Sequence, residues 1–167
     1  LIRDFEKEID RLMERSRTPG AAIAIVRDST ILYMKGFGVK SSNGADSVST
    51  RTVFRLASVS KCFASFLTGI LVEEGTLAWS GPVVKYVPDF KLYTPEQTNE
   101  LTLSHVLSHT TGLPYHTYTN MIEEGMALKD MLEMLKGIKP SNEVGKEYSY
   151  QNVAFSLIGE VIGNATS

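Results

Sequence analysis

The chain has 167 residues, of which 43% are hydrophobic, 22% charged and 9% aromatic. These proportions are typical of a globular domain with a buried core, and they exclude a disordered, collagen-like or disulfide-scaffold protein. The net charge of -2 predicts no nucleic-acid surface, and no apolar run approaches the ~20 residues of a transmembrane helix.

The first 52 residues are expected to combine one helix with two strands. Apolar residues recur at helical spacing at the amino end, and Thr18-Pro19-Gly20 ends this helix. The next apolar run, 21–26, is too short for a globular helix and predicts a buried strand. A turn at Asp28-Ser29 leads to its partner strand over 31–39.

The rest of the chain is predicted to be almost entirely helical. Helices with glycine or proline at their ends are expected at 61–74, 82–86, 103–108, 128–135 and 153–162. The expected class is therefore α/β, with helix and strands over 1–52 and a mostly helical part over 53–167. Because two strands do not make a stable sheet alone, we expect a further segment or another chain to complete it.

A serine and a lysine stand three residues apart in Ser58-Val59-Ser60-Lys61. On a helical turn this spacing brings the hydroxyl and the amine to one face. A serine hydroxyl becomes nucleophilic when a base takes its proton, and a lysine amine can do so where burial lowers its pKa. The alternative is a serine that only caps the helix, beside a surface lysine. Because this lysine stands at the start of a mostly apolar helix, where a charged residue is uncommon, the catalytic interpretation is favoured.

Several segments, in order, resemble the serine β-lactamase and penicillin-binding-protein superfamily, and most closely its class C-like serine hydrolases. They are Thr18-Pro19-Gly20-Ala21-Ala22, 54–61, 71–77, Pro88-Asp89-Phe90, 103–114 and Tyr150-Gln151-Asn152. The resemblance covers most of the chain and implies a β-lactamase/transpeptidase-like fold. The chain would be an N-terminal portion of one catalytic domain, with two or three antiparallel strands plus an all-helical subdomain, lacking the C-terminal strands.

The family's second motif, Y-x-N, has two candidates: Tyr118-Thr119-Asn120 and Tyr150-Gln151-Asn152. Only the second leads directly into an apolar helix and follows Ser58 at a separation like the family's. We therefore predict Tyr150 and Asn152 as functional residues and Tyr118 as a loop residue. Tyr148 is expected to be a packing aromatic.

The resemblance implies a division of labour at the site. Ser58 would attack a carbonyl and become acylated, while Lys61 and Tyr150 would share the proton transfers. Asn152 would hydrogen-bond either the Lys61 side chain or the substrate, and the Ser58 backbone N–H would supply half of an oxyanion hole. Which of Lys61 and Tyr150 is the base stays open.

The family's third motif, Lys or His followed by Thr or Ser and Gly, is not found in the sequence. Both Lys40-Ser41-Ser42 and His109-Thr110-Thr111-Gly112 fail the pattern. In the family this motif lies in the C-terminal half. The chain is therefore expected to be a piece of a longer enzyme, inactive alone, with the C-terminal remainder as its partner.

Other candidate residues receive structural interpretations. His105 and His109 have metal-ligand spacing and are expected on one helix face, but a third ligand is lacking, so neither metal nor cofactor is predicted. His116 could line the substrate cleft. Cys62 is expected to be a small apolar helix residue, and as the single cysteine it cannot form an internal disulfide.

The predicted function is a serine hydrolase with an acyl-enzyme on Ser58 that cleaves an amide, ester or β-lactam in a small-molecule or peptide substrate. β-Lactamases, D-amino-acid peptidases, carboxypeptidases and esterases are all compatible. The alternatives are a penicillin-binding or sensor module that acylates without turnover, and a non-catalytic binding relative. The resemblance favours an extracytoplasmic location, although no signal peptide is recognisable and the chain begins at Leu1.

Overall fold

In the computed structural model, which describes residues 1–167, an antiparallel hairpin lies in the amino-terminal unit Leu1–Leu56. Strand β1 (Gly20–Arg27) pairs with β2 (Thr30–Gly38), and one irregularity interrupts the register between Ile25 and Val26. The predicted turn and both strands are confirmed, but the expectation that the first strand is buried is wrong, because none of its residues is buried. Of the two or three strands expected, two are present, and the segment after β2 adds only an isolated bridge.

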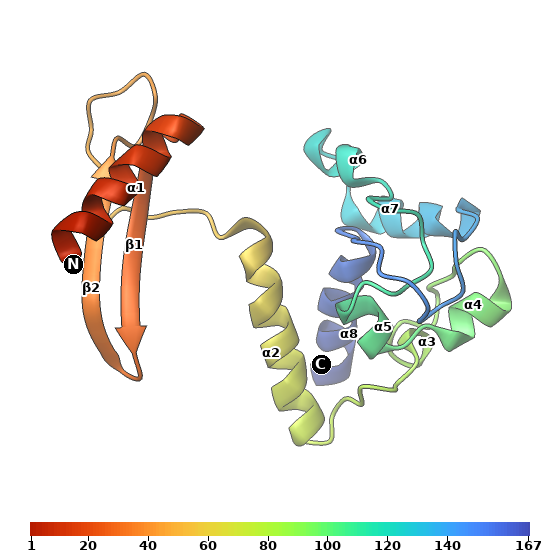
Figure 1. Ribbon diagram of the computed structural model, residues 1–167. Coiled ribbons are helices and arrows are strands. Elements are labelled where there is room, and N and C mark those ends of the chain that lie inside the picture. Colours follow the sequence, from red (N-terminus) through yellow and green to blue (C-terminus); the bar gives the residue numbers. More distant parts are fainter. The chain divides into compact units, whose positions relative to one another are not determined.

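Helix α1 (Ile2–Ser16) packs on this hairpin, as Figure 1 shows in red beside the orange strands. The Phe5 ring meets the edge of the Tyr33 ring at a centroid distance of 5.6 Å. The Glu6 carboxylate accepts a hydrogen bond from the Tyr33 hydroxyl at 3.0 Å and pairs with Lys35 Nζ at 2.8 Å. An apolar contact and a polar pair thus fix the helix to the same strand.

The second unit, Ala57–Ser167, is helical (Figure 1). All five predicted helices are present, and two further short ones, α4 and α6, were not predicted. The α-helices are α2 (Ser60–Glu73), α3 (Val83–Tyr86), α4 (Pro95–Glu100), α5 (Leu103–Leu107), α6 (Thr119–Glu123), α7 (Leu128–Met134) and α8 (Leu157–Thr166). The 3-10 turns are η1 (Ala57–Val59), η2 (Leu135–Gly137) and η3 (Ala154–Ser156).

Helix α8 organises the core of this unit, since it contacts α2, α3 and α5. Its apolar face is buried at Leu157, Ile158 and Val161. Fully buried leucines from other elements pack around it, and burial of each such side chain stabilises the fold by about 1.5–3 kcal/mol. They are Leu101, Leu103, Leu113 and Leu135.

Helix α2 has one buried and one exposed side. Thr68 and Leu71 are buried, whereas the Phe63 and Phe66 side chains remain 64% and 72% exposed. The buried Thr68 hydroxyl donates to the Ala64 carbonyl in the preceding turn, so it needs no other partner. The helix is therefore anchored through the face that meets α8. No helix in the structure has both the length and the hydrophobicity needed to cross a bilayer.

Candidate active site

Ser58 and Lys61 lie where a 3-10 turn runs into helix α2. Ser58 is in η1, and Lys61 follows in the first turn of α2. Ala57, just before the serine, has a left-handed backbone with φ 46°. This conformation is unfavourable in free energy for any residue that carries a Cβ atom. The Ser60 hydroxyl donates to the Ala57 carbonyl at 2.6 Å and supports this bend. The Ser58 side chain is thereby left exposed and the Lys61 side chain half-buried.

The structure brings all four predicted site residues together. The Ser58 Oγ lies 2.6 Å from the Tyr150 hydroxyl, a hydrogen bond in which either oxygen can donate. Lys61 Nζ donates to Asn152 Oδ1 at 2.8 Å. The same ammonium group lies 5.0 Å from the centroid of the Tyr150 ring, so one cation faces both members of the Y-x-N motif.

Phe155 is a site neighbour that the sequence did not reveal as such. Lys61 Nζ lies 5.2 Å from the centroid of its ring, which is buried in the 3-10 turn before α8. A signal existed in the sequence, because Phe155 follows Asn152 by three residues at the start of a helical segment. The Lys61 ammonium therefore has an aromatic surface on two sides in addition to its amide acceptor.

Tyr150 is held in place by a loop about forty residues earlier in the chain. The Ser149 N–H donates to the His109 carbonyl at 2.7 Å, and the Gln151 N–H donates to the His109 Nδ1 at 3.1 Å. The His116 N–H donates to the Tyr150 carbonyl at 3.0 Å. The side chains on either side of Tyr150 are buried, so its own side chain is the one directed to Ser58.

The acidity of the Tyr150 phenol reflects opposing influences. Burial raises the pKa of Tyr150, but the Lys61 ammonium and the hydrogen bond with Ser58 lower it by more, so its pKa lies below the ordinary value. Burial, and then the charge of Lys61, lower the pKa of the His109 imidazole. The site thus makes the phenol easier to ionise and the imidazole harder to protonate than either group is in water.

A cavity of about 590 Å³ opens beside Ser58 and Lys61. One side is formed by η1, α2 and the segment from Asn152 into α8. The other side comes from α6, through Thr119, Ile122 and Glu123. These α6 residues were not predicted, and the short polar segment carries no helical pattern that would have revealed them.

The histidines take separate roles, and the expectation that His105 and His109 share a helix face is wrong. His105 caps α5, with its Nδ1 accepting the Thr102 N–H at 3.3 Å. Helix α5 ends at Leu107, and His109 adopts a left-handed conformation with φ 58°. The His116 ring lies 5.3 Å from the Tyr150 ring, next to the site.

The alternative motif at Tyr118 lies away from this hydrogen-bonded group. Tyr118 is half-buried as the residue that precedes α6, and its hydroxyl donates to the Met134 carbonyl at 3.4 Å. It lies in the turn before α6, as predicted for a loop residue, and its side chain packs against the core. Cys62 is exposed on α2. No three His, Cys, Asp or Glu side chains gather as a metal site would require.

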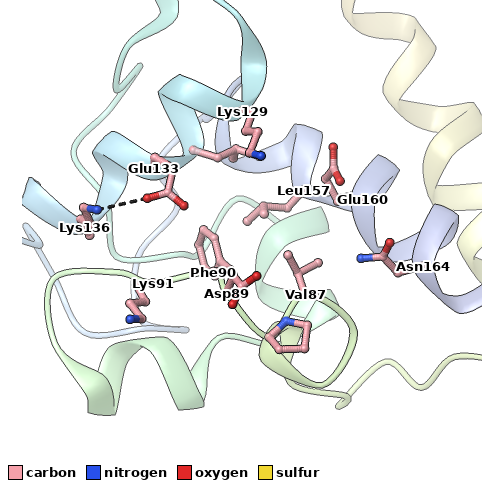
Figure 2. Close-up of a pocket in the computed structure, with 12 residues that line it drawn as sticks. Val87, Asp89, Phe90, Lys91, Lys129, Glu133, Lys136, Leu157, Glu160 and Asn164 are labelled. Carbon is pink, nitrogen blue, oxygen red and sulfur yellow. Dashed lines mark hydrogen bonds and ion pairs between the residues drawn. The ribbon is translucent and has the colours of Figure 1, made fainter.

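A second hollow, of about 290 Å³, lies elsewhere on the helical unit. Figure 2 shows its lining from α7, α8 and the segment after α3, with Phe90 and Leu157 among the apolar side chains. Lysines and carboxylates both line it, and Lys136 is paired with Glu133 at 3.1 Å. It contains none of the four predicted site residues.

Comparison with known proteins gives the chain's family. A family model described as Beta-lactamase matches residues 5–167. The chain is 28% identical over 172 residues to Protein flp of Staphylococcus aureus, covering 99% of this chain and 34% of that protein. It therefore spans about a third of the length of that relative.

Solved structures share the fold. The octameric penicillin-binding protein homologue of Pyrococcus abyssi superposes with a TM-score of 0.85 at 25% identity, over 99% of this chain and 39% of that one. A class C beta lactamase superposes with a TM-score of 0.79 at 24% identity, over 95% of this chain and 42% of that one. The predicted β-lactamase/transpeptidase-like fold is confirmed.

Proposed function

The chain belongs to the beta-lactamase family, and on that premise we propose that it carries the nucleophile and the proton-transfer groups of a serine hydrolase. In this proposal Ser58 forms an acyl-enzyme with an amide, ester or β-lactam. The observation that carries it is the 2.6 Å contact between the Ser58 Oγ and the Tyr150 hydroxyl, beside the ammonium group of Lys61.

Tyr150 is the base in the first step. The Ser58 Oγ transfers its proton to the Tyr150 phenolate as it attacks the carbonyl carbon, and the tetrahedral oxyanion accepts a hydrogen bond from the Ser58 N–H. Tyr150 suits this role because it touches the Ser58 Oγ, whereas the Lys61 ammonium donates to Asn152. The charge of Lys61 stabilises the phenolate.

The second step releases the leaving group. The carbonyl re-forms as the bond to the leaving nitrogen or oxygen breaks, and Tyr150 returns its proton to that atom. Water then attacks the acyl carbon, with Tyr150 again as the base, and Ser58 recovers the proton. Asn152 fixes the Lys61 side chain throughout, and the half-buried Asn152 amide can also meet a substrate in the cavity.

Turnover is proposed for the full-length protein and not for the 167 residues alone. The chain covers 34% of Protein flp, and the apolar side of α2 stays open to solvent. The partner in catalysis is the C-terminal remainder of the protein, which would supply the third motif and the second oxyanion donor. An extracytoplasmic location remains a prediction.

A second candidate function is acylation without turnover, as in a penicillin-binding or sensor module. It is favoured by the structural similarity to the penicillin-binding protein homologue, with its TM-score of 0.85. The two functions share the Ser58 acyl-enzyme and differ only in whether water removes the acyl group. A measurement of labelling together with product release separates them.

The test uses a fluorescent penicillin, an activated ester and a chromogenic β-lactam on the full-length protein. We expect one label per molecule on Ser58, found by intact-mass and peptide analysis, followed by steady product release with at least one substrate. Ser58→Ala should abolish labelling, while the matched control Ser65→Ala, on the same helix, should label normally. Labelling that survives in Ser58→Ala contradicts the proposal; labelling with no release supports the second candidate.

A further inference from the structure

We propose that His109 is a positioning residue for Tyr150: its uncharged imidazole holds the Tyr150 segment and so sets the acidic limit of the reaction. The inference rests on the function proposed above and assigns to His109 a role beyond packing. His109 touches neither Ser58 nor the cavity beside it, and it would act only through the phenol.

The first argument is the way His109 clasps the backbone around Tyr150. Its carbonyl accepts the Ser149 N–H at 2.7 Å, and its Nδ1 accepts the Gln151 N–H at 3.1 Å. The imidazole nitrogen thus acts as a hydrogen-bond acceptor for a backbone N–H, as a backbone carbonyl does between paired strands. Tyr150 lies between these two bonds, and its position depends on both.

The second argument is the stacking of rings behind the site. The His109 ring lies 4.5 Å from the Tyr150 ring and 5.3 Å from the Phe155 ring, measured between centroids. The ammonium group of Lys61 faces these same two rings, at 5.0 and 5.2 Å. His109 is 8% exposed, so a shift of its ring is transmitted to the rings that receive Lys61.

The third argument is that the clasp depends on the protonation state. An imidazole nitrogen accepts a hydrogen bond only when it carries no proton, so His109 must be the neutral tautomer with its proton on Nε2. Protonation of Nδ1 would set two N–H groups against each other at the 3.1 Å contact. The bond from the Gln151 N–H is therefore lost when His109 becomes charged, and only the bond to the His109 carbonyl remains.

The groups around His109 disfavour protonation of its imidazole. The titratable groups that face the imidazole are Lys61 from α2 and Tyr148 and Tyr150 from the clasped segment, while His116 lies against Tyr150. Burial and the Lys61 charge hold the His109 pKa below its ordinary value. The neutral form, and with it the Nδ1 bond that positions Tyr150, persists above this lowered pKa and is lost as the pH falls through it.

The test compares the pH dependence of Ser58 acylation in the full-length wild type, His109→Asn, His109→Phe and the control His105→Asn. Asparagine tolerates the left-handed backbone and keeps an acceptor, whereas phenylalanine keeps only the ring. The wild-type rate should fall as Tyr150 becomes protonated and fall more steeply once His109 also becomes protonated. We expect both His109 variants to keep the first fall and to lose the second, steeper one. His109→Phe should also acylate about 10²-fold more slowly at neutral pH because Tyr150 is misplaced, with little change in the concentration for half-saturation.

A second, steeper fall in rate that persists in His109→Asn overturns the proposal, and so does His109→Phe acylating like the wild type. Should His109→Phe fail to fold, His109→Asn decides. A second readout is independent of activity: in protein with labelled tyrosine rings, the Tyr150 NMR signals should move at the His109 midpoint. Independent titration of Tyr150 and His109 refutes the positioning role, whereas coupled titration without Ser58 labelling refutes only the proposed hydrolase.

Discussion

Replacing Tyr150 with phenylalanine removes one oxygen atom and leaves the aromatic ring. The ring contacts with His109 at 4.5 Å and with the Lys61 ammonium at 5.0 Å do not involve that oxygen, so they persist. The hydrogen bond to the Ser58 Oγ, at 2.6 Å, is lost. The substitution therefore isolates the proton transfer from the packing of the site.

Two magnitudes follow. A positioned general base contributes about 10²–10⁴-fold to the rate, and at 1.36 kcal/mol per tenfold its loss raises the acylation barrier by roughly 3–5 kcal/mol. The exposed Ser58 hydroxyl can turn to water instead, so the stability cost should be no more than about 1 kcal/mol. A large loss of rate with a small loss of stability is the expected signature.

The assay is stopped-flow or quenched labelling of Ser58 by a fluorescent penicillin in the full-length protein, with thermal unfolding measured in parallel. The wild-type rate should rise with pH as Tyr150 ionises, because its pKa lies below the usual value, and Tyr150→Phe should lack this rise. Tyr118→Phe is the matched control, since Tyr118 opens the other Y-x-N sequence and donates to a backbone carbonyl. A Tyr150→Phe rate within about tenfold of wild type would refute the assignment of the base.

Two further predictions concern the lysine and the backbone of the site. Lys61→Ala should slow Ser58 labelling by orders of magnitude, as the loss of one member of a concerted catalytic group does, and normal labelling would contradict its pairing with Tyr150. Gly112→Ala should destabilise the helical unit by more than about 2 kcal/mol, because φ is +80° and a Cβ would approach the Asn142 carbonyl oxygen to 2.5 Å. The control Gly163→Ala, in α8 with open space around it, should instead be neutral or stabilise by up to about 1 kcal/mol; denaturant unfolding compares the two, and equal effects would contradict the argument.

The parts of the site that could be predicted are those whose residues lie close together in the sequence. Ser58 and Lys61 share one turn, and Tyr150-Gln151-Asn152 precedes an apolar helix, so each motif is visible within a short window. The choice between Lys61 and a substrate as partner of Asn152 could not be made from spacing. The structure contains the bond to Lys61, at 2.8 Å.

The role of His109 was missed because its surroundings are built by distant residues. Helical spacing places His105 and His109 together, but the chain leaves the helix at Leu107. What holds His109 in its left-handed conformation are bonds from Ser149 and Gln151, far away in sequence. Hydrophobic periodicity predicts only local structure along the chain, so it could not predict hydrogen bonds between distant residues.

The elements of the fold that could be predicted are likewise those with a clear local sequence pattern. The long amphipathic helix α1 was predicted because its apolar residues repeat with a clear period, and the hairpin because a short apolar run is followed by a turn signal. The short helix α4 was missed, although Thr94 accepts the Gln97 N–H and Pro95 starts the first turn. Both are helix-start signals, but one and a half turns of polar sequence offer no apolar repeat to follow.

Helix α6 is flanked on both sides by residues with a left-handed backbone conformation. It lies between Tyr118 and Gly125, both with left-handed backbones, and none of its residues is fully buried. Yet Ile122 and Glu123 line the same cavity as Ser58. Substitutions at these two positions would therefore alter the shape and charge that a substrate meets without removing any of the reacting atoms.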